Sequence, residues 1–78
     1  MQEGAKPSFR KKGGSIMTMN EYYSMSIRAG MELRKQVESL GKFLREEFIP
    51  EYYRNSKVYQ YRGNVYWIDG ILGIIDIK

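Results

Sequence analysis

The sequence contains no cysteine and no histidine. Disulfides and zinc sites built from these residues are therefore excluded, and so are thiol nucleophiles and the commonest general base. The lack of cysteine is compatible with the cytoplasm, which is the location we expect. No apolar run reaches the ~18 residues that a membrane-spanning helix needs, and no apolar segment follows the basic N-terminus as in a secretory signal. We expect no membrane span, no metal and no cofactor.

Carboxylates are present, but their spacing is not that of a catalytic pair. Glu32, Glu38 and Glu46 are interleaved with lysine and arginine, partly at the four-residue spacing of paired charges on a helix surface. The dipeptide Gly41-Lys42 lacks both the upstream glycine and the following Ser or Thr of a phosphate-binding loop. We therefore predict no catalytic residues and a protein that is not an enzyme.

Most of the positive charge lies at the N-terminus. The chain of 78 residues has a formal charge of +4, and residues 1–16 contribute +3 of it through four basic residues and Glu3. The stretch "KKGGSIM" can be encoded by codons that contain a ribosome-binding sequence before the Met17 codon, as in a small prokaryotic or viral gene. We predict that residues 1–16 are a flexible basic leader, outside the native product if translation starts at Met17 instead of Met1. Residues 17–78 are predicted to form a single small domain.

Residues 20–48 have the pattern of one long amphipathic helix. Apolar residues from Tyr22 to Phe48 recur on one side and charged residues on the other. Asn20, or Thr18 before it, can cap the N-terminus, and Pro50 disfavours helical geometry at the residue before it.

Two glycines interrupt the apolar side of this helix. Gly30 and Gly41 each cost about 1 kcal/mol relative to alanine inside a helix, and they project in nearly the same direction. Their positions predict the close approach of a second backbone, from a partner helix or from the sheet. In the alternative interpretation, Gly41 ends a first helix and Lys42 begins a second, as in a helical hairpin.

The C-terminal part changes to β-forming residues. The turn signals at Gly63-Asn64 and Asp69-Gly70 separate three predicted strands, at about residues 57–62, 65–68 and 71–77. The predicted fold class is α+β, with a long helix followed by a three-stranded antiparallel β-meander, in the order αβββ.

Both faces of this predicted sheet are apolar, although one helix can cover only one of them. Alternation places on the first face Tyr59, Tyr61, Tyr66, Ile68, Ile71, Ile75 and Ile77. The second face then receives Val58, Gln60, Arg62, Val65, Trp67, Leu72, Ile74 and Asp76. Uncovered apolar surface of this kind marks an interface. The predicted interface with a second copy or another protein consists of Gly30, Gly41, Val65, Trp67, Leu72 and Ile74.

These features favour a small non-catalytic interaction or regulatory module that self-associates and docks a protein partner through apolar surface. The alternative is a small nucleic-acid-binding regulator. It would use a basic line on the helix, aromatic and basic residues on the sheet, and the basic N-terminal arm: Arg28, Lys35 and Lys42 on the helix, and Tyr59, Tyr61 and Arg62 on the sheet.

Overall fold

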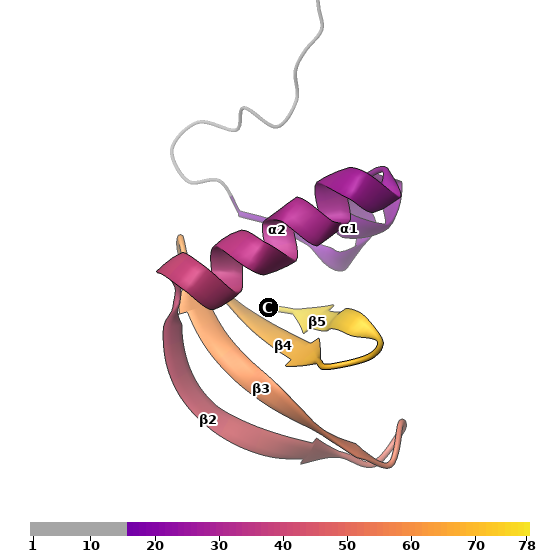
Figure 1. Ribbon diagram of the computed structural model, residues 1–78, viewed down its shortest axis with the longest axis vertical. Helices are drawn as coiled ribbons and strands as arrows, with labels where there is room; N and C mark the ends of the chain where they lie inside the picture. The colour runs from indigo at the N-terminus through magenta and orange to yellow at the C-terminus, as the bar shows by residue number, and fades with distance from the viewer. Residues whose placement is uncertain (1–15) are drawn as a thin grey trace, which may run out of the picture.

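Two helices pack on one side of a curved antiparallel sheet (Figure 1). The computed structural model describes residues 16–78, so the predicted leader, apart from Ile16, lies outside the described residues. The elements are α1 (Met19–Ser24), α2 (Ile27–Leu40), β2 (Lys42–Ile49), β3 (Arg54–Tyr61), β4 (Asn64–Asp69) and β5 (Gly73–Ile77). The predicted α+β class is confirmed, but the sheet has four strands in the order β2-β3-β4-β5. Within residues 16–78, neither helix is long and apolar enough to cross a membrane.

The helical segment is shorter than predicted and is broken once. Thr18, and not Asn20, is the N-cap of α1, where its side chain and that of Glu21 form a reciprocal capping box. Met25 is extended, and Ser26 starts α2 by accepting a hydrogen bond from the Ala29 N–H. The prediction of one continuous helix over residues 20–48 is therefore wrong.

Gly41 ends α2, and the chain continues as a strand. The Gly41 N–H donates to the Val37 carbonyl in the last helical turn. The predicted helix end at Gly41 in the hairpin alternative is thus confirmed, whereas a second helix from Lys42 is wrong. β2 pairs with β3 from Lys42↔Gln60 to Ile49↔Arg54, with an irregularity between Phe43 and Arg45.

The three predicted strands correspond roughly to β3, β4 and β5. Arg62 and Gly63 have φ angles of 50° and 83°, which is the backbone geometry of a type I′ hairpin turn. Asn64, the residue after this turn, fixes the start of the described chain. Its side-chain amide accepts a bond from the Met17 N–H and donates to the Met17 carbonyl, each at 2.9 Å.

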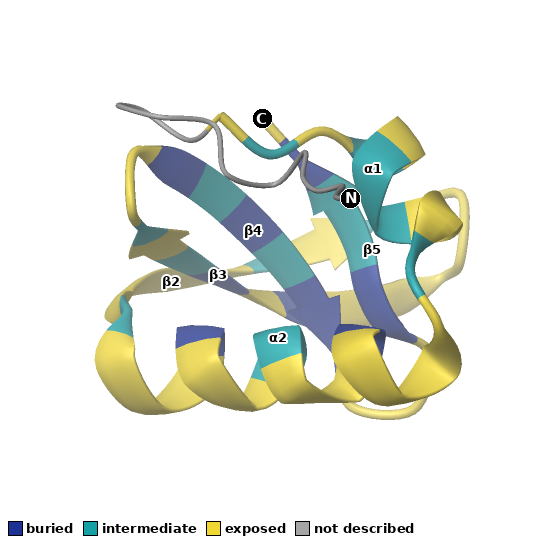
Figure 2. Ribbon diagram, turned by 90° about the horizontal axis from the view of Figure 1, so that it is seen from above, coloured by how far each residue is buried: buried dark blue, intermediate teal, exposed yellow. Residues whose placement is uncertain are grey.

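The core lies between α2 and the sheet (Figure 2). Its buried side chains come from α2, β4 and β5, and they are Val37, Tyr66, Ile68, Ile74 and Ile77. Partly buried side chains border this cluster, and they include Tyr22, Leu33, Tyr59 and Tyr61. In Figure 2 the outward side of α2 is exposed along its length, as expected of an amphipathic helix over a sheet.

Ile74 is the main correction to the predicted sheet faces. Strict alternation places Ile74 on the second face and Ile75 on the helix side. In the structure Ile74 is only 4% exposed and pairs with Ile68 inside the core, while Ile75 is half-buried. A β-bulge between the pairs of Trp67 and Ile68 inserts one residue into β5, and this insertion exchanges the two isoleucines.

The β4–β5 connection produces this shift. The carboxylate of Asp69 is buried, and its Oδ2 accepts bonds from the N–H groups of Ile71 and Leu72. Its Oδ1 accepts a 2.7 Å bond from Arg54 on β3. Gly73, with φ of 86°, then begins β5 in a conformation that favours glycine. Ile71 and Leu72, predicted as strand residues, therefore lie in an exposed turn.

These contacts predict that acid destabilises the fold. The hydrogen bond from Arg54, followed by the N–H groups of Leu72 and Ile71, lowers the pKa of Asp69 from 3.8 to about 2. Because the folded-state pKa is the lower one, the stabilisation is fully present above the unfolded pKa and is lost as the pH falls through the folded one. We expect the thermal midpoint to fall between about pH 4 and about pH 2.

The variant Asp69→Asn tests this assignment. It should have a lower thermal midpoint at neutral pH and a shallower dependence on pH in the acid range, measured by circular dichroism. Glu32→Gln, which removes an exposed carboxylate from α2, should keep the wild-type acid profile. Equal pH profiles for wild type and Asp69→Asn would show that Asp69 does not stabilise the fold through its charge.

Candidate interaction surfaces

The second face of the sheet is covered in part by its own long side chains. Val58 on β3 is fully buried, and its register partner on β4, Trp67, is half-buried. The Trp67 Nε1–H donates to Glu47 Oε1 at 3.2 Å, and the same oxygen accepts two bonds from Arg45. The ammonium of Lys78 lies 5.4 Å from the centre of the Trp67 ring. Trp67 lies on the predicted face, but the side chains of Arg45, Glu47 and Lys78 cover more of this face than expected.

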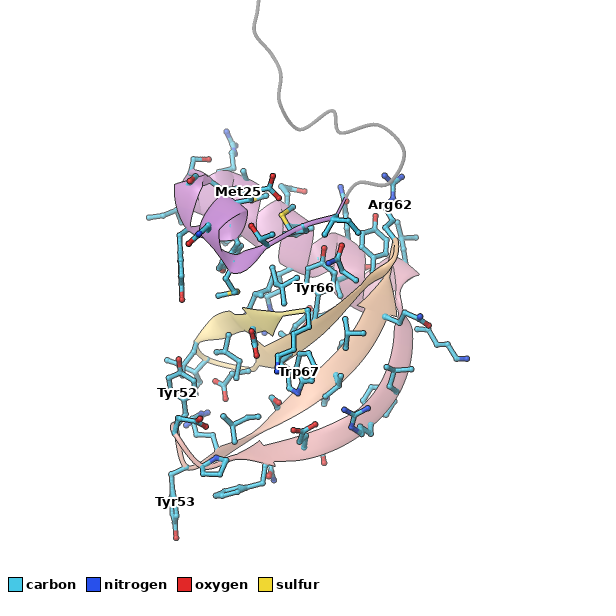
Figure 3. All side chains as sticks on the ribbon, turned by 180° about the vertical axis from the view of Figure 1, so that it is seen from behind. Met25, Tyr52, Tyr53, Arg62, Tyr66 and Trp67 are labelled. Carbon is cyan, nitrogen blue, oxygen red and sulfur yellow. The ribbon has the colours of Figure 1, made fainter. Side chains whose placement is uncertain are left out.

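Beside Trp67 the surface has an open hollow of about 330 Å³. Figure 3 shows Trp67 within the curve of the sheet and Tyr52 at the tip of the β2–β3 hairpin. The other lining residues are apolar Phe48, Ile49, Pro50 and Ile75, the carboxylates Glu47, Glu51 and Asp76, and Lys78 with its ammonium. We call this feature the Trp67 hollow. Its aromatic and acidic lining is suited to a cationic group.

A second surface lies along β2, the edge strand that begins directly after α2. Phe43 and Phe48 are 52% and 50% exposed. The register places both on the helix side of the sheet. Their rings pack edge-on against Tyr59 and Tyr53 respectively. Glu46 lies between the two phenylalanines on the same side of β2. We call the exposed apolar side chains along this edge the β2 strip: Leu40 at the end of α2, Phe43, Phe48 and Tyr53.

The outer side of β2 has no neighbouring strand among the described residues, because β2 stands first in the sheet order. Its backbone groups on that side are available for pairing with another strand. Two features of β2 limit uncontrolled pairing: a bulge near Leu44, and the charged run from Arg45 to Glu47.

The predicted interface residues are not brought together into one surface. Gly30 is buried, where a Cβ would lie 3.2 Å from the ring of Tyr22, so the close approach at this glycine is made by α1 of the same chain. Gly41 contacts the Gln60 backbone on β3. Ile74 is in the core and Leu72 is in the β4–β5 turn. Val65 and Trp67 remain on the second face, both half-buried.

The predicted nucleic-acid residues are also dispersed. Arg28 and Lys35 are exposed on α2, but Lys42 is the first residue of β2 and so does not extend a helical line. On the sheet, Tyr59 and Tyr61 face α2 and border the core. The Tyr61 hydroxyl donates to the Gln36 side chain. Arg62 lies at the β3–β4 turn, with its guanidinium 5.7 Å from the centre of the Tyr61 ring.

The acidic side chains among the described residues do not gather into a metal site. No group of three or more acidic side chains among residues 16–78 is arranged to hold a metal ion. The buried carboxylate of Asp69 accepts its hydrogen bonds from Arg54 and from the N–H groups of Ile71 and Leu72 in the β4–β5 turn. Comparison with protein-family models gives no match for the chain. Comparisons with curated proteins and with solved structures give none either.

Proposed function

We propose that the protein is a small non-catalytic interaction module that self-associates through β2 and docks a protein partner. The observation that supports this most directly is the β2 strip: half-exposed phenylalanines beside an open strand edge. Large apolar side chains exposed along an unpaired strand edge are uncommon on a small monomeric domain unless something covers them. Pairing of two β2 edges would satisfy the outer backbone groups and would extend the apolar strip across both copies.

The charges of β2 support an antiparallel arrangement about a two-fold axis at Glu46. In that register, Arg45 of each copy lies directly opposite Glu47 of the other, so that opposite charges face each other on the second face. The two Glu46 carboxylates meet on the helix side. Lys57 is the register partner of Glu46 on β3, so the row of four charges across the dimer is neutral.

Charge reversal at the centre of this row is the experiment that tests the proposal. Glu46→Lys would place four positive charges in the row, and we expect it to weaken dimerisation at least about tenfold. The wild-type protein at tens of micromolar should sediment as a dimer and Glu46→Lys as a monomer. Because Glu46 is exposed, the thermal midpoint of the monomer should change little.

Glu32→Lys is the matched control, since it makes the same charge change at an exposed position of α2. It should sediment as the wild type does. If Glu46→Lys dimerises as well as the wild type, the two copies do not meet at β2.

The nucleic-acid alternative now rests on Arg28 and Lys35 on α2 and on Arg62 at the β3–β4 turn. Their exposure supports it, whereas the carboxylates around Trp67 disfavour phosphate on the second face. Binding to DNA or RNA through these side chains should weaken steeply with added salt. Self-association that buries Phe43 and Phe48 should persist at the same salt concentrations.

A further inference from the structure

We infer that the Trp67 hollow is a binding site for a basic side chain, contributed by a lysine- or arginine-bearing segment of a partner protein. The site lies on the face of the sheet opposite the helices. It does not depend on self-association through β2, so either proposal can fail without the other.

The charge around the hollow is the first argument. Glu47, Glu51 and Asp76 line it, and Lys78 is its only cationic lining residue among the described residues. With Arg45, which bonds to Glu47, the side chains around the hollow still sum to −1. Asp76 and Glu47 are partly exposed, at 43% and 40%, so an approaching cation can reach both carboxylates from solvent.

The aromatic floor is the second argument. An ammonium or guanidinium group is attracted to the face of a tryptophan ring within about 6 Å of its centre. The Trp67 ring is held in a fixed orientation by its hydrogen bond to Glu47. Tyr52 provides a second ring at the hairpin tip, so a bound side chain contacts aromatic surface as well as charge.

The chain's own Lys78 shows which chemistry the hollow accepts. Its ammonium lies 5.4 Å from the centre of the Trp67 ring and 3.7 Å from Asp76 Oδ2. The Lys78 side chain is nevertheless 69% exposed, so it is held by these two contacts and not by packing. A basic side chain from a partner can therefore replace the Lys78 ammonium over Trp67 and gain the same two interactions.

Trp67 is the only tryptophan of the chain, so its fluorescence reports directly on this site. We would titrate the full-length protein with acetylated, amidated tetralysine and tetra-arginine, and with tetraglutamine as the uncharged control. The expected result is a saturable change in Trp67 emission with the basic peptides only. Asp76→Asn should weaken this binding about five- to tenfold, because it removes the carboxylate beside the bound cation.

Lys78→Gln gives the opposite expectation. It removes the ammonium that competes for Trp67 and should tighten binding of the basic peptides by about threefold or more. Two variants on α2 control for net charge alone: Glu32→Gln for Asp76→Asn, and Lys35→Gln for Lys78→Gln. Neither control should change the affinity by as much as its counterpart at the hollow.

Three results would overturn the proposal. Trp67 emission could stay unchanged up to millimolar tetralysine and tetra-arginine. The α2 controls could shift the affinity as much as Asp76→Asn and Lys78→Gln do. A short oligothymidylate could alter Trp67 emission while the basic peptides do not, which would assign the face to nucleic acid instead.

Discussion

Gly41→Ala is expected to lower the free energy of unfolding by about 3 kcal/mol, the upper end of the range for overpacking in a closely packed region. Gly41 joins α2 to β2. A Cβ there would lie 2.5 Å from the Val37 carbonyl oxygen and 3.0 Å from the Gln60 carbonyl oxygen. Both are backbone atoms of packed elements, so relief would require α2 to move away from β3. The φ of Gly41 is −78°, which any residue adopts, so the cost comes from crowding alone.

Gly70→Ala is the matched control for Gly41→Ala. Gly70 lies in the β4–β5 turn, and a Cβ at this position has no atom within 4 Å. In urea denaturation, its free energy of unfolding should differ from that of the wild type by no more than about 0.5 kcal/mol, the usual range for a surface substitution. If both variants lose the same stability, or if Gly41→Ala loses none, then the helix-to-strand junction is not as tight as the structure indicates.

Replacing Ile74 with alanine should destabilise the protein by about 2–5 kcal/mol, whereas Ile75→Ala should cost about 1 kcal/mol or less. The two residues are adjacent and chemically identical. They differ because the β5 bulge turns Ile74 into the core and leaves Ile75 half-buried beside Trp67. Urea denaturation of the two variants under the same conditions compares them directly.

This pair also decides between the two face assignments. Strict alternation of the third predicted strand places Ile75 in the core and makes Ile74 the dispensable residue. A larger loss of stability for Ile75→Ala than for Ile74→Ala would therefore contradict the register of β4 and β5 in the structure.

The missed strand β2 shows where a single sequence is ambiguous. The segment from Lys42 to Ile49 consists largely of good helix formers, and Leu40, Leu44 and Phe48 recur at the four-residue spacing of a helix. None of its residues is buried, so no alternation of buried and exposed positions identifies a strand. Pairing with β3 overrides the local preference, and only Gly41 indicated the boundary.

The turns explain which parts of the sheet could be predicted. The antiparallel pairing of β3 with β4 was predicted from a two-residue loop at Gly63-Asn64, but the observed loop is Arg62-Gly63, one residue earlier. Between Asp69 and Gly73 the signals at Asp69-Gly70 gave the turn but not its length. The hydrogen bonds to the Asp69 carboxylate and the positive φ of Gly73 extend the turn through Leu72. As a result, Ile74 and Ile75 lie on the opposite sides of the sheet from those that were predicted.

The candidate surfaces were predictable to a different extent. Trp67 lies on the predicted face, although the predicted register of β3 with β4 was wrong. The observed pairs, such as Tyr59 with Tyr66, differ by two residues from those of a Gly63-Asn64 loop, and a shift of two leaves each side chain on the same face. Phe43 and Phe48 were assigned to the apolar side of a helix, which concealed their position on an open edge strand. The acidic lining of the Trp67 hollow combines β2, β5 and the hairpin tip, and these segments come together only through the curvature of the sheet.

Sedimentation equilibrium of the wild-type protein is the most direct measurement of the central claim that β2 joins two copies. The account predicts a mass of about twice the 9.2 kDa of the chain at tens of micromolar, dissociating on dilution as a weak dimer does. A mass of 9.2 kDa at every concentration up to about 500 micromolar would contradict it.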